Sequence, residues 1–176
     1  MKFLFLFSLL FFSLPVKAQT IYLKPSEALK TIFHTSEEII PDKKTLTSEQ
    51  KEILKKKIGY AAPKDDWTFY IAKTKGSIDG YAVVDNEVGK TEPITFLTVM
   101  TPQGSVHAVE ILVYREPYGS EVHEERFLKQ FDHKTTHDPI KLDQDITHMT
   151  GATLSSRAMT VGVKRDLALW EIFYSK

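Results

Sequence analysis

The stretch ITFLTVM-TPQGS-VHAVEILVY, from Ile94 to Tyr114, decides the fold. Its two flanks are rich in β-branched and aromatic residues, which favour strands, and the central segment 101–105 contains the Pro and Gly typical of a hairpin turn. In the second flank, apolar residues at Val109, Ile111 and Val113 recur at every other position, so one face of that strand is expected to meet the core. The stretch therefore predicts an antiparallel hairpin.

The same strand signals continue upstream of the hairpin and give way to helical signals downstream. Two more strands are expected over Trp67–Ala72 and Ile78–Asp85, which extends the hairpin to an antiparallel meander. Helices are expected over 122–131 and 153–174, the second with an amphipathic pattern. Strands followed by helices predict an α+β fold, in which helices pack on an antiparallel sheet.

The segment 19–62 is predicted to form a small N-terminal helical extension, ahead of a domain over 63–176. A short helix is expected from Pro25 to Phe33. A second helix should begin after Thr47, because Gln50 three residues later completes a capping-box pattern, and should end near Gly59.

The first 18 residues have the pattern of a secretory signal peptide. Lys2 precedes an apolar run from Phe3 to Leu14, and small residues stand near Ala18, where cleavage would leave Gln19 as the first residue. The alternative is an uncleaved anchor, although the apolar run is shorter than the roughly 20 residues that a membrane helix needs. We therefore expect an exported protein, in the periplasm or on the outer face of the cytoplasmic membrane.

Composition narrows the classes of function. The chain has 23 basic and 23 acidic residues and therefore lacks the basic excess of nucleic-acid-binding proteins, so no nucleic-acid partner is expected. It has no cysteine, which excludes disulfides, thiolate metal sites, iron–sulphur clusters and c-type haem attachment. His133 and His137 have a spacing that two metal ligands can use, but no third and fourth ligand are evident, so no metal is expected.

The chemistry is expected in the hydroxyl-rich segment THMTGATLSS, which ends at Ser156 and leads into the last helix. The first N–H groups of a helix lack internal acceptors and, together with the helix dipole, favour a phosphate. Gly151 and Ala152 leave room beside Thr153, and Arg157 in the first turn suits an anionic group. The simpler alternative is that the segment only caps the helix.

The motif Thr150-Gly-Ala-Thr-Leu-Ser-Ser156 resembles the flavinylation motif of the FMN-binding domain family. That family includes the flavin-bearing subunits of the sodium-pumping NADH:quinone reductase and of the Rnf complex. The resemblance implies that Thr153 carries FMN as a phosphoester, transferred from FAD by a magnesium-dependent flavin transferase. The other motif positions implied to bind the cofactor are Thr150, Gly151, Ala152, Leu154, Ser155 and Ser156.

The resemblance also covers the loop Tyr114-Arg-Glu-Pro-Tyr-Gly119, although this loop departs from the usual Glu-Thr-Pro-Gly-Leu-Gly pattern of the family. It implies flavin contacts for Glu116, Pro117 and Tyr118. Altogether the likeness runs from about Trp67 to Leu169.

The resemblance favours an electron-transfer protein over a self-contained enzyme. A flavin exchanges electrons without a general acid, nucleophile or metal from the protein, so the protein only has to bind and tune it. The expected partners are the flavin transferase and a membrane redox protein that donates or accepts electrons. Two alternatives stay open: an FMN-dependent reductase of a small exported substrate, and a non-redox binding module.

Overall fold

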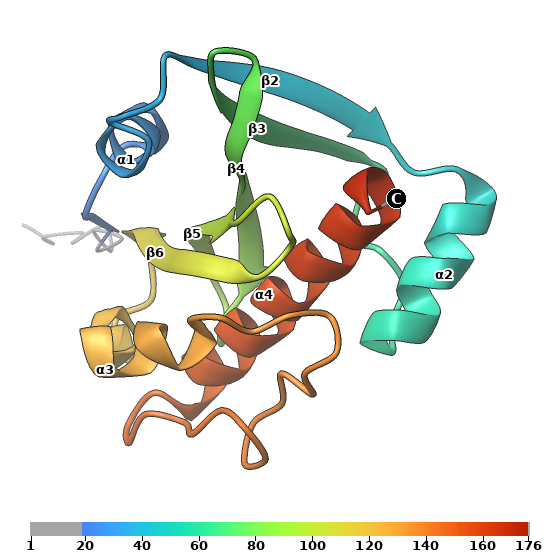
Figure 1. Ribbon diagram of the computed structural model, residues 1–176. Helices are drawn as coiled ribbons and strands as arrows, with labels where there is room; N and C mark the ends of the chain where they lie inside the picture. Colours follow the sequence, from blue (N-terminus) through green and yellow to red (C-terminus); the bar gives the residue numbers. More distant parts are fainter. Residues whose placement is uncertain (1–18, 176) are drawn as a thin grey trace, which may run out of the picture.

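The computed structural model describes residues 19–175 and shows an α+β fold, which confirms the predicted fold class (Figure 1). A six-stranded antiparallel sheet has the strand order β1-β6-β5-β4-β3-β2. The signal segment expected over 1–18 lies outside the described residues. In chain order the elements are β1 (Thr20–Ile21), α1 (Pro25–Ile32), β2 (Glu38–Thr45), α2 (Ser48–Ile58), β3 (Asp66–Thr74), β4 (Ser77–Val88), β5 (Pro93–Met100), β6 (Val106–Tyr114), η1 (Ser120–His123), α3 (Glu125–Leu128), η2 (Lys129–Phe131) and α4 (Thr153–Tyr174).

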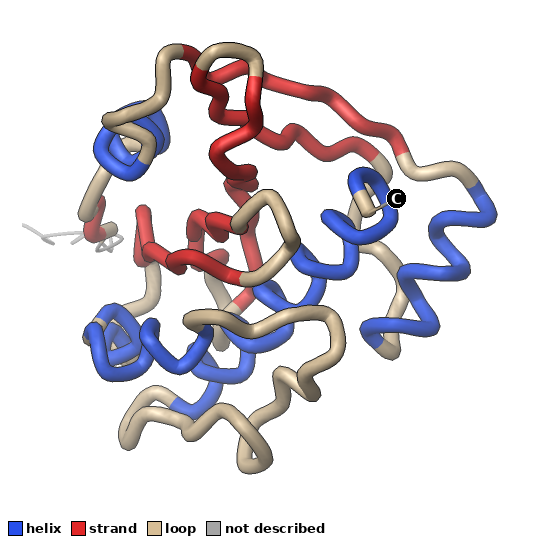
Figure 2. Tube along the Cα trace, in the orientation of Figure 1, coloured by secondary structure: helices blue, strands red, loops and turns tan. Residues whose placement is uncertain are grey.

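The four strands predicted from the sequence are β3 to β6, each paired with its neighbour in the chain. Sequential hairpins explain why local patterns were sufficient to find them. Every residue of β5 from 94 to 100 is buried, because helices cover both faces of the sheet (Figure 2). We expected β6 to face the core on one side, but Ile111 packs in the cluster under α4 while Leu112 packs in a second cluster under α1.

The extension over 19–62 contains the two predicted helices, α1 and α2. The capping box of α2 is present: the Gln50 backbone N–H donates to Thr47 Oγ1 over 3.2 Å, and the Thr47 N–H donates to Gln50 Oε1 over 3.0 Å. The extension is not only helical, however, since β1 and β2 form the two edges of the sheet. The polar sequence of β2 hid this strand, because an edge strand needs little apolar burial and gains its order by pairing along its whole length with β3.

The long helix α4 lies across β4 and β5 and has the predicted bounds (Figure 1). A Cβ atom at Gly162 would lie 2.3 Å from the ring of Phe96, so the absence of a side chain at this position allows the close contact between α4 and β5. The middle of α4 is therefore fixed against the sheet, while its first turn begins at the end of a long connecting loop.

The expected single helix over 122–131 is wrong. Three short helical turns, η1, α3 and η2, occupy this region, because Glu124 adopts an extended conformation with ψ of 135° between the first two. The loop after them is irregular and is held by Asp145, whose carboxylate accepts from the backbone N–H groups of Ile140 and Lys141 and from Lys134 Nζ. Burial opposes ionisation of Asp145, but these donors outweigh it and lower its pKa.

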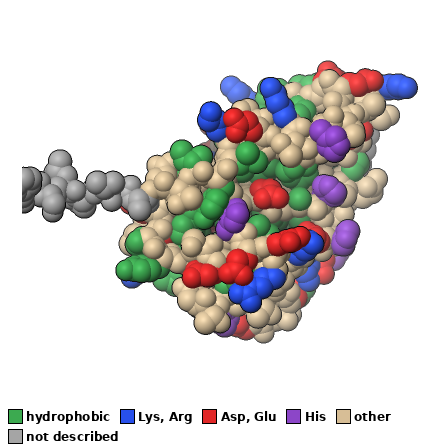
Figure 3. Space-filling model, turned by 90° about the vertical axis from the view of Figure 1, so that its left-hand side faces the viewer, with side chains coloured by type: hydrophobic (Ala, Val, Ile, Leu, Met, Phe, Trp, Pro, Cys, Tyr) green, Lys and Arg blue, Asp and Glu red, His purple; other side chains and the backbone are tan. Residues whose placement is uncertain are grey.

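The surface mixes charges of both signs. In the face shown in Figure 3, basic, acidic, histidine and apolar side chains are interspersed, without a continuous basic stripe. Among residues 19–175, no helix has the length and apolar character needed to cross a membrane.

Candidate functional site at the start of α4

The segment 150–156 forms a tight turn and the first turn of α4. Gly151 has φ of +82°, a left-handed conformation that glycine adopts without strain, and Ala152 is the N-cap residue but offers no side-chain cap. Thr153 is the first helical residue, and its side chain is exposed. The structure therefore does not support the alternative that the side chains of this segment serve only to cap the helix.

The start of α4 leaves several donors without protein acceptors. Within residues 19–175, the backbone N–H groups of Thr153, Leu154 and Ser155 have no hydrogen-bond acceptor, and the Thr153 hydroxyl has no hydrogen-bond partner. The first intrahelical bond is that from the Ser156 N–H to Ala152 O, over 2.8 Å. Such an uncapped helix start, with its partial positive charge, matches the requirements of a bound phosphate.

The two serines of the motif point inward. Ser156 Oγ accepts from the Met149 N–H over 3.0 Å. Ser155 Oγ lies 2.7 Å from Tyr114 Oη, which itself donates to Tyr118 O over 2.6 Å. Because burial raises the pKa of Tyr114 and its phenol has one proton, Ser155 is the donor in the Ser155–Tyr114 pair. Ser156 thus fixes the backbone of Met149 next to the helix start, and Ser155 fixes Tyr114 there.

The loop 114–119 packs against the start of α4 and contains three residues for which the resemblance implied flavin contacts. Pro117 and Tyr118 are exposed, Tyr118 at 84%. Gly119 has φ of +89°, and a Cβ there would lie 2.8 Å from both Ser155 Oγ and Tyr114 Oη. The loop and the motif are therefore in direct contact.

Glu116 has a different environment from its two neighbours. Its side chain is buried, and its carboxylate accepts from the backbone N–H groups of Lys90, Thr91 and Glu92 and from Thr91 Oγ1, over 2.5 to 3.1 Å. Burial opposes ionisation, but the four donors outweigh it and lower the pKa of Glu116. All four donors lie in the turn between β4 and β5, so the Glu116 carboxylate fixes the loop 114–119 to that turn.

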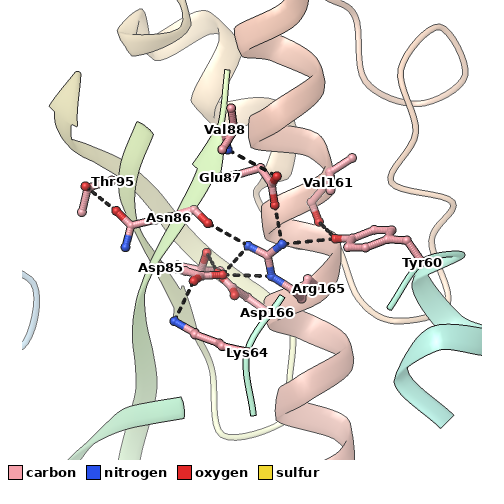
Figure 4. Close-up of polar contacts among 11 residues, drawn as sticks. Tyr60, Lys64, Asp85, Asn86, Glu87, Val88, Thr95, Val161, Arg165 and Asp166 are labelled. Carbon is pink, nitrogen blue, oxygen red and sulfur yellow. Dashed lines mark hydrogen bonds and ion pairs between the residues drawn. The ribbon is translucent and has the colours of Figure 1, made fainter. Parts of the chain in front are cut away.

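Farther along α4, Arg165 is fully buried in a polar network that the sequence analysis missed (Figure 4). Its Nε and Nη2 donate to Asp85, Nη2 also donates to the Asn86 carbonyl, and Nη1 donates to Glu87 and to Tyr60 Oη. These contacts use the five N–H donors of the guanidinium. The only available signal was a short charged run, Lys164-Arg165-Asp166, within an otherwise apolar helical stretch.

Asp166 completes this network as a buried carboxyl. Its Oδ2 accepts from Thr98 Oγ1 over 2.6 Å, but its Oδ1 is buried with no hydrogen-bond partner among residues 19–175. Burial first and the neighbouring Asp85 second raise the pKa of Asp166 well above its ordinary value. A protonated Asp166 removes one negative charge from the interior and supplies an O–H donor toward Asp85.

The histidines do not gather at a common centre. His148, next to the motif, is exposed and pairs through Nδ1 with Asp143 over 3.0 Å. His133 and His137 lie in two separate turns rather than on one helical face. Across the described part of the chain, no group of three or more histidine or acidic residues is placed to hold a metal ion.

The fold and the site together define an α+β domain with an open, hydroxyl-bearing helix start suited to a phosphate group. Residues 89–168 match the family model described as the FMN-binding domain. This match includes both the loop 114–119 and the motif 150–156, and it supports FMN as the cofactor. No curated protein matches the chain.

Proposed function

We propose that this protein is an exported flavoprotein that carries FMN as a phosphoester on Thr153 and transfers electrons. The observation that carries the proposal is the exposed, unpartnered Thr153 hydroxyl at the uncapped start of α4, inside the matched FMN-binding domain. The N–H groups of the first turn are placed to stabilise a phosphate on that hydroxyl.

Attachment requires a flavin transferase and FAD. The Thr153 oxygen forms a bond to the phosphorus of the FMN half and loses its proton, while the pyrophosphate bond breaks and AMP leaves. The exposed positions of Thr150, Gly151 and Leu154 keep the surroundings of this hydroxyl open to a second protein. By contrast, the buried Ser155 and Ser156 stabilise the conformation of the turn through their hydrogen bonds to Tyr114 and Met149.

The electron-transfer role follows from the chemistry that the bound group supplies. FMN supplies reversible uptake and release of electrons, and the protein positions it and tunes its potential. A membrane redox protein is the proposed donor or acceptor, and residues 1–18 are the proposed export signal, which places the site in the periplasm or on the outer face of the cytoplasmic membrane.

Intact mass spectrometry of the full chain, produced with and without an active flavin transferase, tests this proposal. We expect a mass increase of one FMN less one water only when the transferase is present, in an exported protein whose first residue is Gln19. The purified protein should be yellow, and its visible absorption should disappear on reduction and return on reoxidation. An unmodified mass despite transferase and FAD would refute the covalent attachment.

A further inference from the structure

One edge of the sheet is open along part of β6. At the end of this strand, β1 pairs with residues 113–114, and the chain after β1 donates to the Leu112 carbonyl. At its start, the turn 133–134 exchanges two backbone hydrogen bonds of 2.8 Å with Val106. Between these contacts, residues 107–111 make no backbone hydrogen bond within the described chain except in their pairing with β5. Because alternate residues of a strand direct their N–H and C=O groups to opposite sides, this stretch presents free donors and acceptors.

A cavity of about 370 Å³ lies along this open stretch. The four successive residues 107–110 line it, although neighbouring side chains of a strand point to opposite faces of the sheet. Val109 belongs to the core cluster under α4, while Ala108 packs against the cluster under α1. The cavity is therefore at the edge of the sheet and reaches the backbone of β6. We call it the edge groove; its opposite wall, on and beside α3 (Figure 1), consists of His123, Glu125, Leu128, Lys129 and Asp132.

The edge groove has the shape that a short extended segment needs. Its apolar base contains Val109 and Leu128, which are both buried. One end of its wall is fixed, because the ring of His123 stacks on that of Tyr22 with the centroids 3.9 Å apart. Residues 107–111 span about 17 Å, so a segment of similar length can pair with them as an additional strand.

The charge of the edge groove is negative. Its lining contains three acidic side chains and one lysine, and this lysine, Lys129, pairs with Glu125 over 2.6 Å. The carboxylates of Glu110 and Asp132 make no hydrogen bond or salt bridge within residues 19–175. Burial raises the pKa of Glu110, and the nearby His123 offsets only part of this effect. A cation brought into the groove would therefore find two carboxylates without a partner cation.

The opposite edge of the sheet is protected against an added strand. β2 contains Pro41, which has no N–H donor, and Lys43 and Lys44, which repel a basic segment. The open stretch 107–111 of β6 contains neither proline nor lysine. Of these two strands, β6 is therefore the one that suits a basic segment.

We propose that the edge groove binds an extended, basic segment of a partner protein, which adds to the sheet as a strand beside β6. The backbone of residues 107–111 pairs with the segment, and Glu110 and Asp132 attract its cationic side chains. This inference goes beyond the proposed function and does not depend on flavin attachment. A partner held there lies near the loop 114–119, because Glu110 is about 13 Å from Tyr114 along the strand.

A synthetic peptide of eight alternating lysine and valine residues is the probe, and fluorescence anisotropy follows its binding to the full exported chain. Glu110→Gln and Asp132→Asn should each weaken binding about threefold, and the double variant about tenfold. Glu38→Gln is the matched control, because Glu38 is an exposed acid of β2 at the opposite edge of the sheet, and it should bind as the wild type does. Absence of binding to the wild type, or an equal loss in Glu38→Gln, would overturn the inference.

Two further measurements separate backbone pairing from charge attraction. A peptide with the same side chains but an N-methyl group on every residue keeps the charges and lacks the N–H donors, so it should not bind. With the unmodified peptide, amide hydrogen exchange should become slower in residues 107–111 and stay unchanged in β2. Equal binding of the N-methylated peptide, or slower exchange in β2 in place of β6, would likewise overturn the inference.

Discussion

The first turn and the middle of α4 have opposite environments. In its first turn, Thr153 and Leu154 are exposed, and the leading N–H groups have no protein acceptors. Three turns later, Arg165 and Asp166 are completely buried, and the guanidinium uses all its donors on protein acceptors. One rigid helix therefore separates the part that stabilises the fold from the part that is open to a cofactor. Substitutions in the first turn and in the middle of α4 should consequently affect different properties.

Arg165→Leu should have the largest effect on stability. It leaves Asp85 and Glu87 without their buried cation, and breaking such a network costs about 3 to 5 kcal/mol. Urea unfolding of the flavin-free protein measures this. The matched control is Arg157→Leu on the exposed part of the same helix, for which we expect a change within about 0.5 kcal/mol. Equal losses of stability for the two variants would contradict the contrast between the exposed and the buried part of α4.

Gly119→Ala should have the next largest effect, because it disturbs the contact between the loop 114–119 and the first turn of α4. The new methyl group would lie 2.8 Å from Ser155 Oγ and Tyr114 Oη, and overpacking of this kind costs about 1 to 3 kcal/mol. Gly59→Ala is the control, since Gly59 has the same φ of +89° but a methyl group there would meet no atom within 4 Å. We expect Gly119→Ala to lose more stability in urea unfolding and also to accept less flavin. Equal losses of stability in the two variants would contradict this account, because they would show that the positive φ alone, and not the contact with Ser155 and Tyr114, determines the effect at Gly119.

Asp166→Asn should have a smaller effect that depends on pH. The folded pKa of Asp166 is raised, so its contribution to stability is complete below the unfolded value of 3.8 and is lost as the pH rises toward the folded value. Asparagine has no proton to lose, can accept from Thr98 and can donate toward Asp85. At pH 8 the variant should therefore equal the wild type or exceed it by about 1 kcal/mol.

Urea unfolding of both proteins at pH 5 and pH 8 measures this dependence. The free energy of unfolding of Asp166→Asn, relative to the wild type, should be greater at pH 8 than at pH 5. A difference that stays constant, or that decreases with pH, would show that Asp166 is ionised in the folded protein.

The parts of the fold that local patterns determine could be predicted from the sequence. The strands β3 to β6 alternate or concentrate apolar residues between clear turns, and the limits of α2 and α4 follow from their capping and small residues. The edge strands β1 and β2 could not be predicted in this way, because their order comes from pairing with β6 and β3 rather than from their own burial.

The same distinction holds for the site. The position of Thr153 at the first turn of a helix followed from its neighbours in the sequence. The inward hydroxyls of Ser155 and Ser156, and the binding of Glu116 to the turn at 90–92, depend on contacts between distant segments. The network of Arg165 likewise joins residues about 80 and 105 positions apart, which no local pattern reveals.

The central claim is that the exposed end of α4 carries the flavin on Thr153, and a Thr153→Ala variant tests it most directly. Because the Thr153 hydroxyl has no partner within the described chain, its removal should change the free energy of unfolding by no more than about 0.5 kcal/mol. The matched control is Thr150→Ala, which removes another exposed threonine hydroxyl of the same motif.

Both variants should be produced with an active flavin transferase and viewed for flavin fluorescence on a denaturing gel, with circular dichroism as the folding control. We predict that Thr153→Ala is folded and dark, while Thr150→Ala keeps a fluorescent band. A fluorescent Thr153→Ala band beside a dark Thr150→Ala band would contradict the assignment of the ester to Thr153.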